Sequence, residues 1–210
     1  MRIARIYPSF LLTAALLIAL APNIASAQTS IALSAYGAFS GATTGNGTQQ
    51  SPSNQAGGLF QLRHTSNPIL GFEATYSFNR ANQAYSQSAH ACPVGVVPCG
   101  PLPVSVPANA HEVTADWIPS VHIANLRPFG ILGAGVLLNV PDGGQVATTT
   151  SAKAVYVYGA GLDWGLIPHL GLRLQYRGNL YKAPDLSKLY TSTDAFTHTA
   201  EPMVGLYVRF

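Results

Sequence analysis

The feature that most constrains the fold of this chain is a two-residue alternation of apolar and polar side chains. Over residues 70–79 every second side chain is apolar, and the residues between them are glycine or polar, with Glu73 among them. The same alternation runs through residues 152–164, 171–180 and 196–210. Successive side chains of a β-strand point to opposite faces, so these segments predict strands with one apolar and one polar face.

Four further segments complete the predicted sheet with weaker patterns. Residues 59–64 and 112–117 alternate over a short length, residues 126–139 are rich in glycine, and residues 30–40 are apolar without a clear phase. These segments bring the prediction to about eight strands, and bacterial single-chain membrane barrels have even strand numbers.

The predicted connectors alternate in length, as those of an up-and-down barrel do. The short ones are residues 65–68, 119–125 and 165–170, and the long ones are residues 41–57, 80–110, 141–151 and 182–195. Short turns lie on the periplasmic side of such barrels and long loops lie outside, which predicts that both termini are periplasmic. Five prolines in residues 80–110 argue against a further hairpin there, because proline removes a donor from a strand ladder.

The start of the chain has the organisation of a secretory signal peptide. Two early arginines precede an apolar run over residues 10–21, and a small-x-small pattern ends at Ala27. The run is too short for a membrane-anchor helix, which needs about 20 apolar residues. We expect cleavage between Ala27 and Gln28, so residues 1–27 are a signal peptide and residues 28–210 form one barrel domain.

Composition excludes other classes of exported or membrane protein. Only 9% of the residues are charged, against about 25% in ordinary soluble domains. Without the two arginines of the signal peptide, nine basic and eight acidic residues remain, so no nucleic-acid partner is expected. The longest later apolar run, residues 129–138, contains three glycines and is too short to span a membrane as a helix. The sequence therefore predicts an all-β, antiparallel, up-and-down transmembrane barrel, in which every backbone polar group is paired.

The positions of the charged residues agree with this barrel. Eleven fall on the polar phase of the predicted strands, and these are Arg63, Glu73, Glu112, Asp116, Arg127, Lys153, Asp163, Arg173, Arg177, Glu201 and Arg209. The other six charged residues after residue 28 lie in the connectors, so none faces lipid, where Lys or Arg would cost about 2–4 kcal/mol. An eight-stranded barrel is just wide enough for side chains to fill, so we expect a packed polar lumen.

Two predicted hairpins specify partners within this lumen. A turn at residues 165–170 would place Asp163 opposite Arg173, and the last hairpin would place Glu201 opposite Arg177. A static salt-bridge core is the favoured interpretation, and a gated, narrow ion path is the alternative.

Cys92 and Cys99 lie in the second long connector. A disulfide between them is expected because exported proteins are oxidised. A metal site is not expected, since two sulfur ligands and the nearby His90 do not complete a ligand set.

Aromatic residues are expected to form girdles at both rims of the barrel. The rim at the short turns would carry Trp117, Trp164 and Phe210, and the opposite rim would carry Tyr76, Phe78 and Tyr181.

The last eight residues resemble the C-terminal recognition signal of outer-membrane proteins. A terminal aromatic, Phe210, is preceded by apolar residues at every second position, namely Val208, Leu206 and Val204, although Tyr is common where Val208 stands. With the strand-turn-strand of residues 158–181, this ending makes the chain similar to the small eight-stranded outer-membrane barrels of Gram-negative bacteria, the OmpA/OmpX-like group. The resemblance implies a monomer embedded among outer-membrane lipids and lipopolysaccharide. It also implies that periplasmic chaperones and the barrel-assembly machinery handle the chain, and that it needs no cofactor.

The expected function is a structural or surface-interaction role through the extracellular loops. A narrow ion channel is the alternative, and a lipid A deacylase is less favoured. Such deacylases have a His-x-Ser spacing, whereas here His198 is followed by Thr199 and Ala200. His198 and Thr199 are neighbours in a strand and should point to opposite faces, so no enzymatic activity is expected.

Overall fold

The computed structural model describes residues 28–87, 102–143 and 146–210. The predicted signal peptide and the two cysteines, Cys92 and Cys99, lie outside these ranges. Within them the chain forms ten strands, which are β1 (Gln28–Ser40), β2 (Thr43–Gly45), β3 (Thr48–Pro52), β4 (Gln55–Thr65), β5 (Gly71–Gln87), β6 (Val104–Trp117), β7 (Leu126–Pro141), β8 (Ser151–Ile167), β9 (Leu170–Lys182) and β10 (Phe196–Arg209). No helix in the described ranges is long and apolar enough to cross a membrane.

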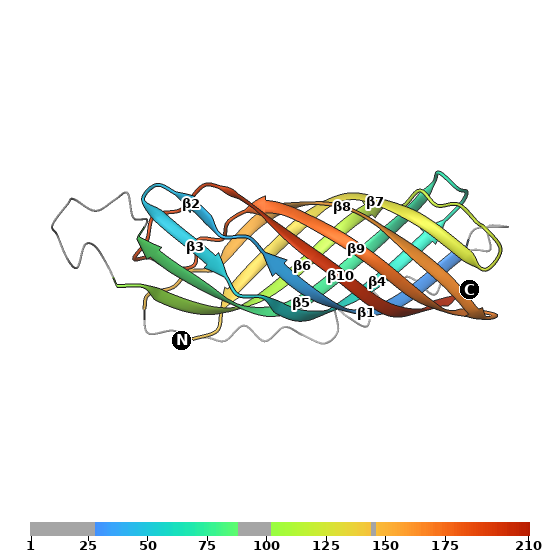
Figure 1. Cartoon of the computed structure of the whole chain (residues 1–210), viewed down its shortest axis with the longest axis horizontal. Helices are drawn as coiled ribbons and strands as arrows, with labels where there is room; N and C mark the ends of the chain where they lie inside the picture. Colours follow the sequence, from blue (N-terminus) through green and yellow to red (C-terminus); the bar gives the residue numbers. More distant parts are fainter. Residues whose placement is uncertain (1–27, 88–101, 144–145) are drawn as a thin grey trace, which may run out of the picture.

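Eight of the strands close into an antiparallel barrel (Figure 1). Around the barrel the order is β1, β4, β5, β6, β7, β8, β9 and β10, and β10 pairs with β1 to complete the ring. This confirms the predicted all-β, up-and-down barrel of eight strands. We refer to the end where β1 begins and β10 ends as the terminal end, and to the opposite end, where β2 and β3 lie, as the loop end.

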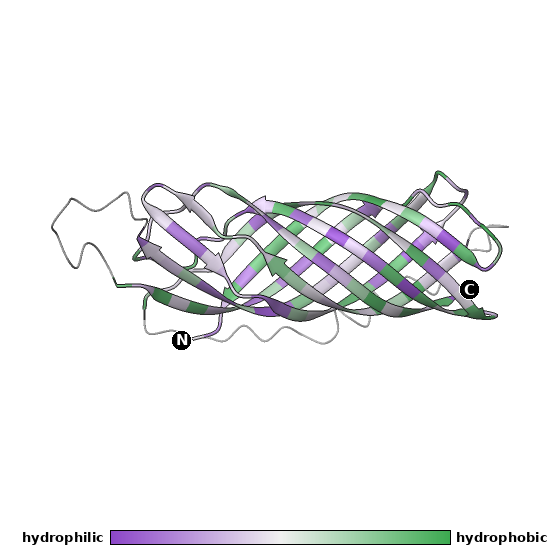
Figure 2. Cartoon of the chain, viewed as in Figure 1, coloured by the Kyte–Doolittle hydropathy of each residue, from purple (hydrophilic) through white to green (hydrophobic). Residues whose placement is uncertain are grey.

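Side chains of the barrel strands alternate between the lumen and the outer surface. In β5, Glu73 and Thr75 are buried, whereas Phe72 and Tyr76 are 58% and 43% exposed. The phase of β1, which the sequence left undefined, places its serines inside and Leu33 outside. Figure 2 shows this pattern as bands of apolar and polar colour along each strand. The outer wall between the two ends is therefore apolar.

The lumen is not polar on every wall. On β7 and β8 the inward side chains include Phe129, Ile131, Leu137, Val155 and Val157, all nearly fully buried. The prediction of a polar lumen is correct for most inward residues of β5 and β9 and for β6 from Glu112 onward. It is wrong for this wall and for a second apolar cluster inside the barrel, formed by Tyr36, Ala38, Leu59 and Met203. Val155 and Val157 stand on the inward phase of β8, so both phases are apolar in the middle of this strand. A barrel of this width buries inward side chains of either kind.

The predicted aromatic rims are present, with one correction. Five of the six residues are exposed on the outer surface, and these are Tyr76, Phe78, Trp117, Trp164 and Phe210. Tyr181 was predicted to join them, and this is wrong. It points into the lumen, is 8% exposed, and its hydroxyl lies 2.9 Å from that of Thr199.

A short hairpin that the sequence analysis did not predict extends the sheet at the loop end. β2 and β3 lie within residues 41–57, which we expected to be a loop, and β3 pairs with β5. They are joined by Asn46 and Gly47, with φ of 48° and 75°. Two-residue hairpin turns of this kind favour Asn-Gly, so the signal for this hairpin is present in the sequence.

β5 and β6 also continue further than predicted. Residues 80–87 and 104–110, which we expected to be loop, belong to these two strands. Pro107 is accommodated in β6 because its carbonyl oxygen accepts a hydrogen bond from the Asp142 nitrogen at 2.8 Å, on the β7 side. The nitrogen and carbonyl of one strand residue point to the same side, so the missing N–H of Pro107 removes no donor that β5 needs.

The seam between β1 and β10 holds the barrel closed and is interrupted at one place. Opposite Glu201 and Pro202 the described register contains no β1 partner. Pro202 has no N–H to donate, which explains the break. The rest of the seam is paired, and the nitrogen of Phe210 adds a bond to the Thr29 carbonyl oxygen at 2.8 Å.

The position of Phe210 at the end of this seam leads to a prediction about assembly. We expect deletion of Phe210 to reduce the amount of inserted barrel more strongly than it reduces the stability of barrels already formed. The physical reason is that the alternating edge of β10 offers an unpaired strand for extension by β-augmentation, and an open edge is not tolerated in lipid.

The measurement is the yield of heat-modifiable, membrane-inserted protein in cells. Trp164→Ala is the matched control, because it removes an aromatic side chain that is also exposed at the terminal rim. Equal yields from the two variants would show that Phe210 serves only as a rim aromatic.

Candidate functional site

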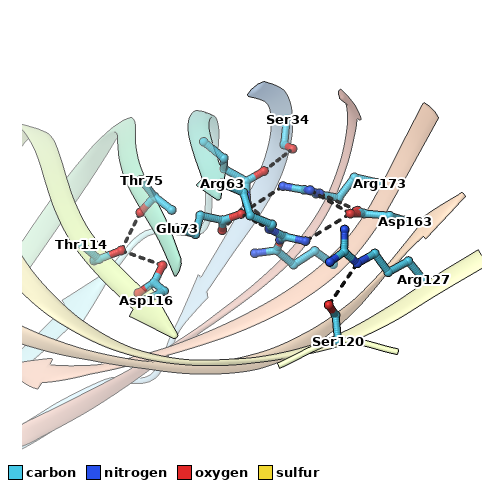
Figure 3. Close-up of polar contacts among 12 residues, drawn as sticks. Ser34, Arg63, Glu73, Thr75, Thr114, Asp116, Ser120, Arg127, Asp163 and Arg173 are labelled. Atoms are coloured by element: carbon cyan, nitrogen blue, oxygen red, sulfur yellow. Dashed lines mark hydrogen bonds and ion pairs between the residues drawn. The ribbon is translucent and has the colours of Figure 1, made fainter. Parts of the chain in front are cut away.

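Four charged side chains meet across the terminal half of the lumen (Figure 3). Arg63 and Glu73 come from β4 and β5, and Asp163 and Arg173 come from β8 and β9 on the opposite wall. We call these four residues the terminal cluster. Each arginine contacts both carboxylates, so the cluster bridges the full width of the barrel.

The geometry of the terminal cluster is tight. Nε of Arg63 lies 2.7 Å from Glu73 Oε2, and its Nη1 lies 3.1 Å from Asp163 Oδ2. Nε of Arg173 lies 2.6 Å from Asp163 Oδ1, and its Nη1 lies 3.1 Å from Glu73 Oε2. All four side chains are at most 6% exposed. Buried pairs of this kind depend on additional hydrogen bonds to offset their desolvation.

Phe129 and Gln61 support the terminal cluster. The guanidinium carbon of Arg63 lies 4.0 Å above the centre of the Phe129 ring. Gln61 donates a hydrogen bond to Glu73 Oε1 at 2.8 Å. The Phe129 ring occupies the space that a side chain at Gly161 would need, because a Cβ added there would overlap the ring. A packed aromatic ring and a bridging ion cluster thus fill this level of the lumen.

A second group of polar residues surrounds Arg177 in the middle of the lumen. Nη2 of Arg177 lies 3.2 Å from Glu112 Oε1 and 3.8 Å from Asp116 Oδ2. Arg177 also donates hydrogen bonds to the hydroxyls of Thr75 and Thr114, at 3.1 and 3.2 Å. We call these five residues the central cluster. It joins β9 to β5 and β6 across the lumen.

The predicted registers are present, but one predicted contact is not. Asp163 pairs with Arg173 and Glu201 pairs with Arg177 in the strand ladders, as expected. Asp163 and Arg173 do form an ion pair. Arg177, however, directs its guanidinium to Glu112, and no ion pair of Glu201 is found among the described residues. The side chain of Arg177 is long enough to cross the lumen, so the strand register did not determine its partner.

The remaining predicted lumen charges lie near the mouths of the barrel. Arg127 at the terminal end donates to Ser120 Oγ at 3.0 Å, and Lys153 at the loop end pairs with Asp185 at 2.7 Å. Arg209 is partly buried near the end of β10. The structure therefore buries eight of the eleven predicted charges and leaves these three partly exposed.

The other predicted site residues are placed as follows. Val204, Leu206, Val208 and Phe210 face outward along β10 and are 39–70% exposed. Gln28, on the far side of the predicted cleavage point, is the first residue of β1.

Uncharged residues of the polar phase complete the two clusters, although the predicted charge network named only charged residues. Gln61, Thr75, Thr114 and Asn179 are buried and each bonds to a charged side chain. They lie on the inward phase of their strands, as the alternation predicts, but their partners could not be read from the phase.

His198 and Thr199 point to opposite sides of the barrel wall. The ring of His198 lies on the outer face, where its Nε2 is 2.8 Å from the Tyr158 hydroxyl. Thr199 is buried, and its hydroxyl is 2.7 Å from Ser40 Oγ. This pair does not assemble the base and nucleophile that a deacylase needs, which are within hydrogen-bond reach of each other.

Comparison with known proteins identifies the fold. No protein-family model matches the sequence, and no curated protein matches it. Among solved structures, the chain is similar to neisserial surface protein A, with 16% identity over 87% of this chain and 97% of that chain and a TM-score of 0.50. It is also similar to the outer membrane protein OprG from Pseudomonas aeruginosa, with 10% identity over 87% and 95% of the two chains and a TM-score of 0.51.

A third structure, Ail of Yersinia pestis, is 18% identical over 89% of this chain and 100% of that chain, with a TM-score of 0.49. Neisserial surface protein A and OprG show that this chain has the fold of the small outer-membrane β-barrels.

The central cluster leads to a prediction about stability. Arg177→Ala should lower the free energy of unfolding by about 3–5 kcal/mol, because it leaves Glu112 and Asp116 buried without their counter-charge. Urea unfolding of the refolded barrel in detergent measures the effect. Combining the substitution with Glu112→Gln should recover part of the loss, since the two residues are in contact.

Arg80→Ala is the matched control. Arg80 forms an ion pair with Asp142 at 2.7 Å, but its side chain is 61% exposed. Exposed pairs contribute about 0–1 kcal/mol to the free energy of unfolding. An equal loss of stability in both variants would contradict the view that burial makes the central cluster important for stability.

Proposed function

We propose that this protein is an integral outer-membrane barrel with a closed lumen, which acts as a surface-interaction protein through its loop end. The observation that carries this proposal is the terminal cluster, whose two arginines bridge opposite walls of the lumen. A barrel sealed in this way is not suited to transport. Its function would therefore depend on contacts that other molecules make with its accessible ends.

The apolar outer wall supports the membrane location. Leu33, Phe72, Val113, Leu132 and Val204 are exposed on different strands of the barrel, each 48–68% accessible. A monomeric soluble protein rarely exposes a continuous apolar surface of such extent, whereas lipid tails and the acyl chains of lipopolysaccharide would cover it.

The loop end is a folded platform and not a set of free loops. A transmembrane strand needs about 9–11 residues, whereas β5 has 17. Beyond Phe78 the outward residues of β5 become polar, starting with Arg80. This part of β5 and β6, with the β2–β3 hairpin, would therefore stand above the membrane.

A small core of its own holds this platform together. Tyr85, Val106, Ala108 and Leu186 form a buried cluster inside the extended strands. The hydroxyl of Tyr85 donates to the Pro184 carbonyl oxygen at 2.7 Å and accepts from the Leu186 nitrogen at 3.1 Å. Burial raises the pKa of Tyr85, so the phenol keeps its proton for the first of these bonds. The segment after β9 is thereby anchored across the mouth of the barrel.

The turns support the proposed orientation. The three connections at the terminal end are short, whereas those at the loop end are longer. In outer-membrane barrels short turns are periplasmic and long loops are extracellular. The platform would then face the exterior, and both termini would be periplasmic.

Conductance tests the closed lumen. We expect the purified, refolded protein to give no steady current in planar bilayers, because the terminal cluster and Phe129 fill the lumen. Arg173→Ala should introduce a leak by removing one bridge, whereas Arg80→Ala should not. A steady conductance of porin size in the unmodified protein would overturn the proposal in favour of a channel.

Epitope accessibility tests the orientation of the platform. An epitope inserted between Asn46 and Gly47, in the β2–β3 turn, should be detected by antibody on intact cells. The same epitope at Ala124, an exposed turn residue at the terminal end, should be detected only after the outer membrane is permeabilised. The reverse pattern would contradict the proposed topology.

A further inference from the structure

Negative charge exceeds positive charge among the buried residues of the lumen. Three arginines and five carboxylates are buried there, and these are Arg63, Arg173, Arg177, Glu73, Glu112, Asp116, Asp163 and Glu201. A buried charge without a counter-charge is very unfavourable. The two excess carboxylates must therefore either take up a proton or have a cation beside them.

One of the two excess carboxylates belongs to the central cluster, and the other is Glu201. The terminal cluster is balanced, since it contains two arginines and two carboxylates. In the central cluster Arg177 is shared by Glu112 and Asp116. Glu201, the next carboxylate, has no ion pair among the described residues, although it is only 3% exposed.

A cavity of about 30 Å³ lies beside Glu201. Its lining includes Glu112 and Glu201, and none of the described lining residues is Lys, Arg or His. The remaining polar lining consists of hydroxyl and amide side chains. The cavity is large enough for a water-sized occupant, which needs about 10–15 Å³ on this measure.

Oxygen atoms without partners line this cavity. Glu201 Oε2 and Asn179 Oδ1 are buried and have no hydrogen-bond partner in the described structure. The amide nitrogen of Asn139, another lining residue, is also without a partner. Asn179 is held in place by the bond from its Nδ2 to Glu112 Oε2 at 3.0 Å.

The geometry points to a binding site for one small monovalent metal cation, such as sodium or potassium, in this cavity. Carboxylate and carbonyl oxygens suit hard cations. Calcium takes 6–8 oxygen ligands, usually with several carboxylates, whereas here Glu112 is already engaged by Arg177 and Glu201 supplies the one unshared charge. A single positive charge matches that carboxylate.

The cation would enter from the loop end and stop at this site. The cavity lining includes Pro52 at the end of β3, Ser53 directly after it, and Gln83 in the extended part of β5. These residues lie at the loop end. In the other direction the central and terminal clusters fill the lumen. The site therefore binds an ion without conducting it, and this inference does not depend on the role of the platform.

Thermal unfolding in different chloride salts tests the site. At constant ionic strength and pH, sodium or potassium should raise the unfolding midpoint of the detergent-solubilised barrel above its value in choline chloride. Choline is too large for the cavity. The expected shift is about 3–6 °C when the cation is at tenfold its Kd. Glu201→Gln should abolish the difference between salts, whereas Asp194→Asn should keep it, because Asp194 is an exposed carboxylate at the same end.

Direct binding of a heavier analogue gives a second measurement that does not depend on a variant folding. Equilibrium dialysis of the wild-type barrel with thallous ion should show one site per chain, displaced by potassium and not by choline. Anomalous scattering from soaked crystals should place the ion beside Glu201 and Asn179. No bound ion, or an ion elsewhere, would overturn the inference. A midpoint that follows pH but not the identity of the cation would also overturn it, since a proton would then compensate Glu201.

Discussion

The constraint on which this structure depends is that lipid offers no hydrogen bonds to the backbone. Every strand that crosses the membrane must be paired on both sides, and only a closed sheet meets that requirement. The seam between β1 and β10 therefore decides whether the fold exists, although its strands lie at opposite ends of the described chain. The break opposite Glu201 and Pro202 is the one place in the described seam where this requirement is relaxed.

Closure with eight strands also determines the width of the lumen, and the width determines what the inward side chains do. Arginines on one wall reach carboxylates on the opposite wall, so the terminal cluster forms between strands that are not neighbours. The same narrowness leaves no bulk water to solvate an unmatched charge. An ionised carboxylate such as Glu201 then needs a positively charged partner, and the cavity beside it is where a cation would bind.

The platform at the loop end is structurally distinct from the apolar wall of the barrel. Beyond the apolar wall, most outward residues of β5 and β6 are polar, and their inward residues build a second small core around Leu186. Figure 2 shows the hairpin of β2 and β3 as pale to polar in colour, beside the banded barrel. A surface of this kind can vary in sequence without disturbing the strand pairing of the apolar wall.

Much of the barrel could be predicted from the sequence because the information is local. The alternation in β5, β9 and β10 identifies the inward face, and the turn between β8 and β9 sets the register that places Asp163 opposite Arg173. The predictions of inward residues and of strands were wrong where the alternation is absent or where a turn motif was not used. Both phases are apolar in the middle of β8, at Val155 and Val157. Tyr181 lies just past the predicted end of its strand, and the Asn46-Gly47 turn was not recognised as a hairpin.

By itself, the sequence determined the number of barrel strands, their order around the barrel and which charged residues face inward. Each of these follows from the two-residue alternation and from the turns between consecutive strands. The tertiary structure alone decided which charges meet across the lumen. Arg177 stands beside Glu201 in the ladder but bonds to Glu112 on the far side of the lumen. Contacts across a barrel depend on its diameter and on the tilt of its strands. Neither quantity can be predicted from the residue pattern of a single strand.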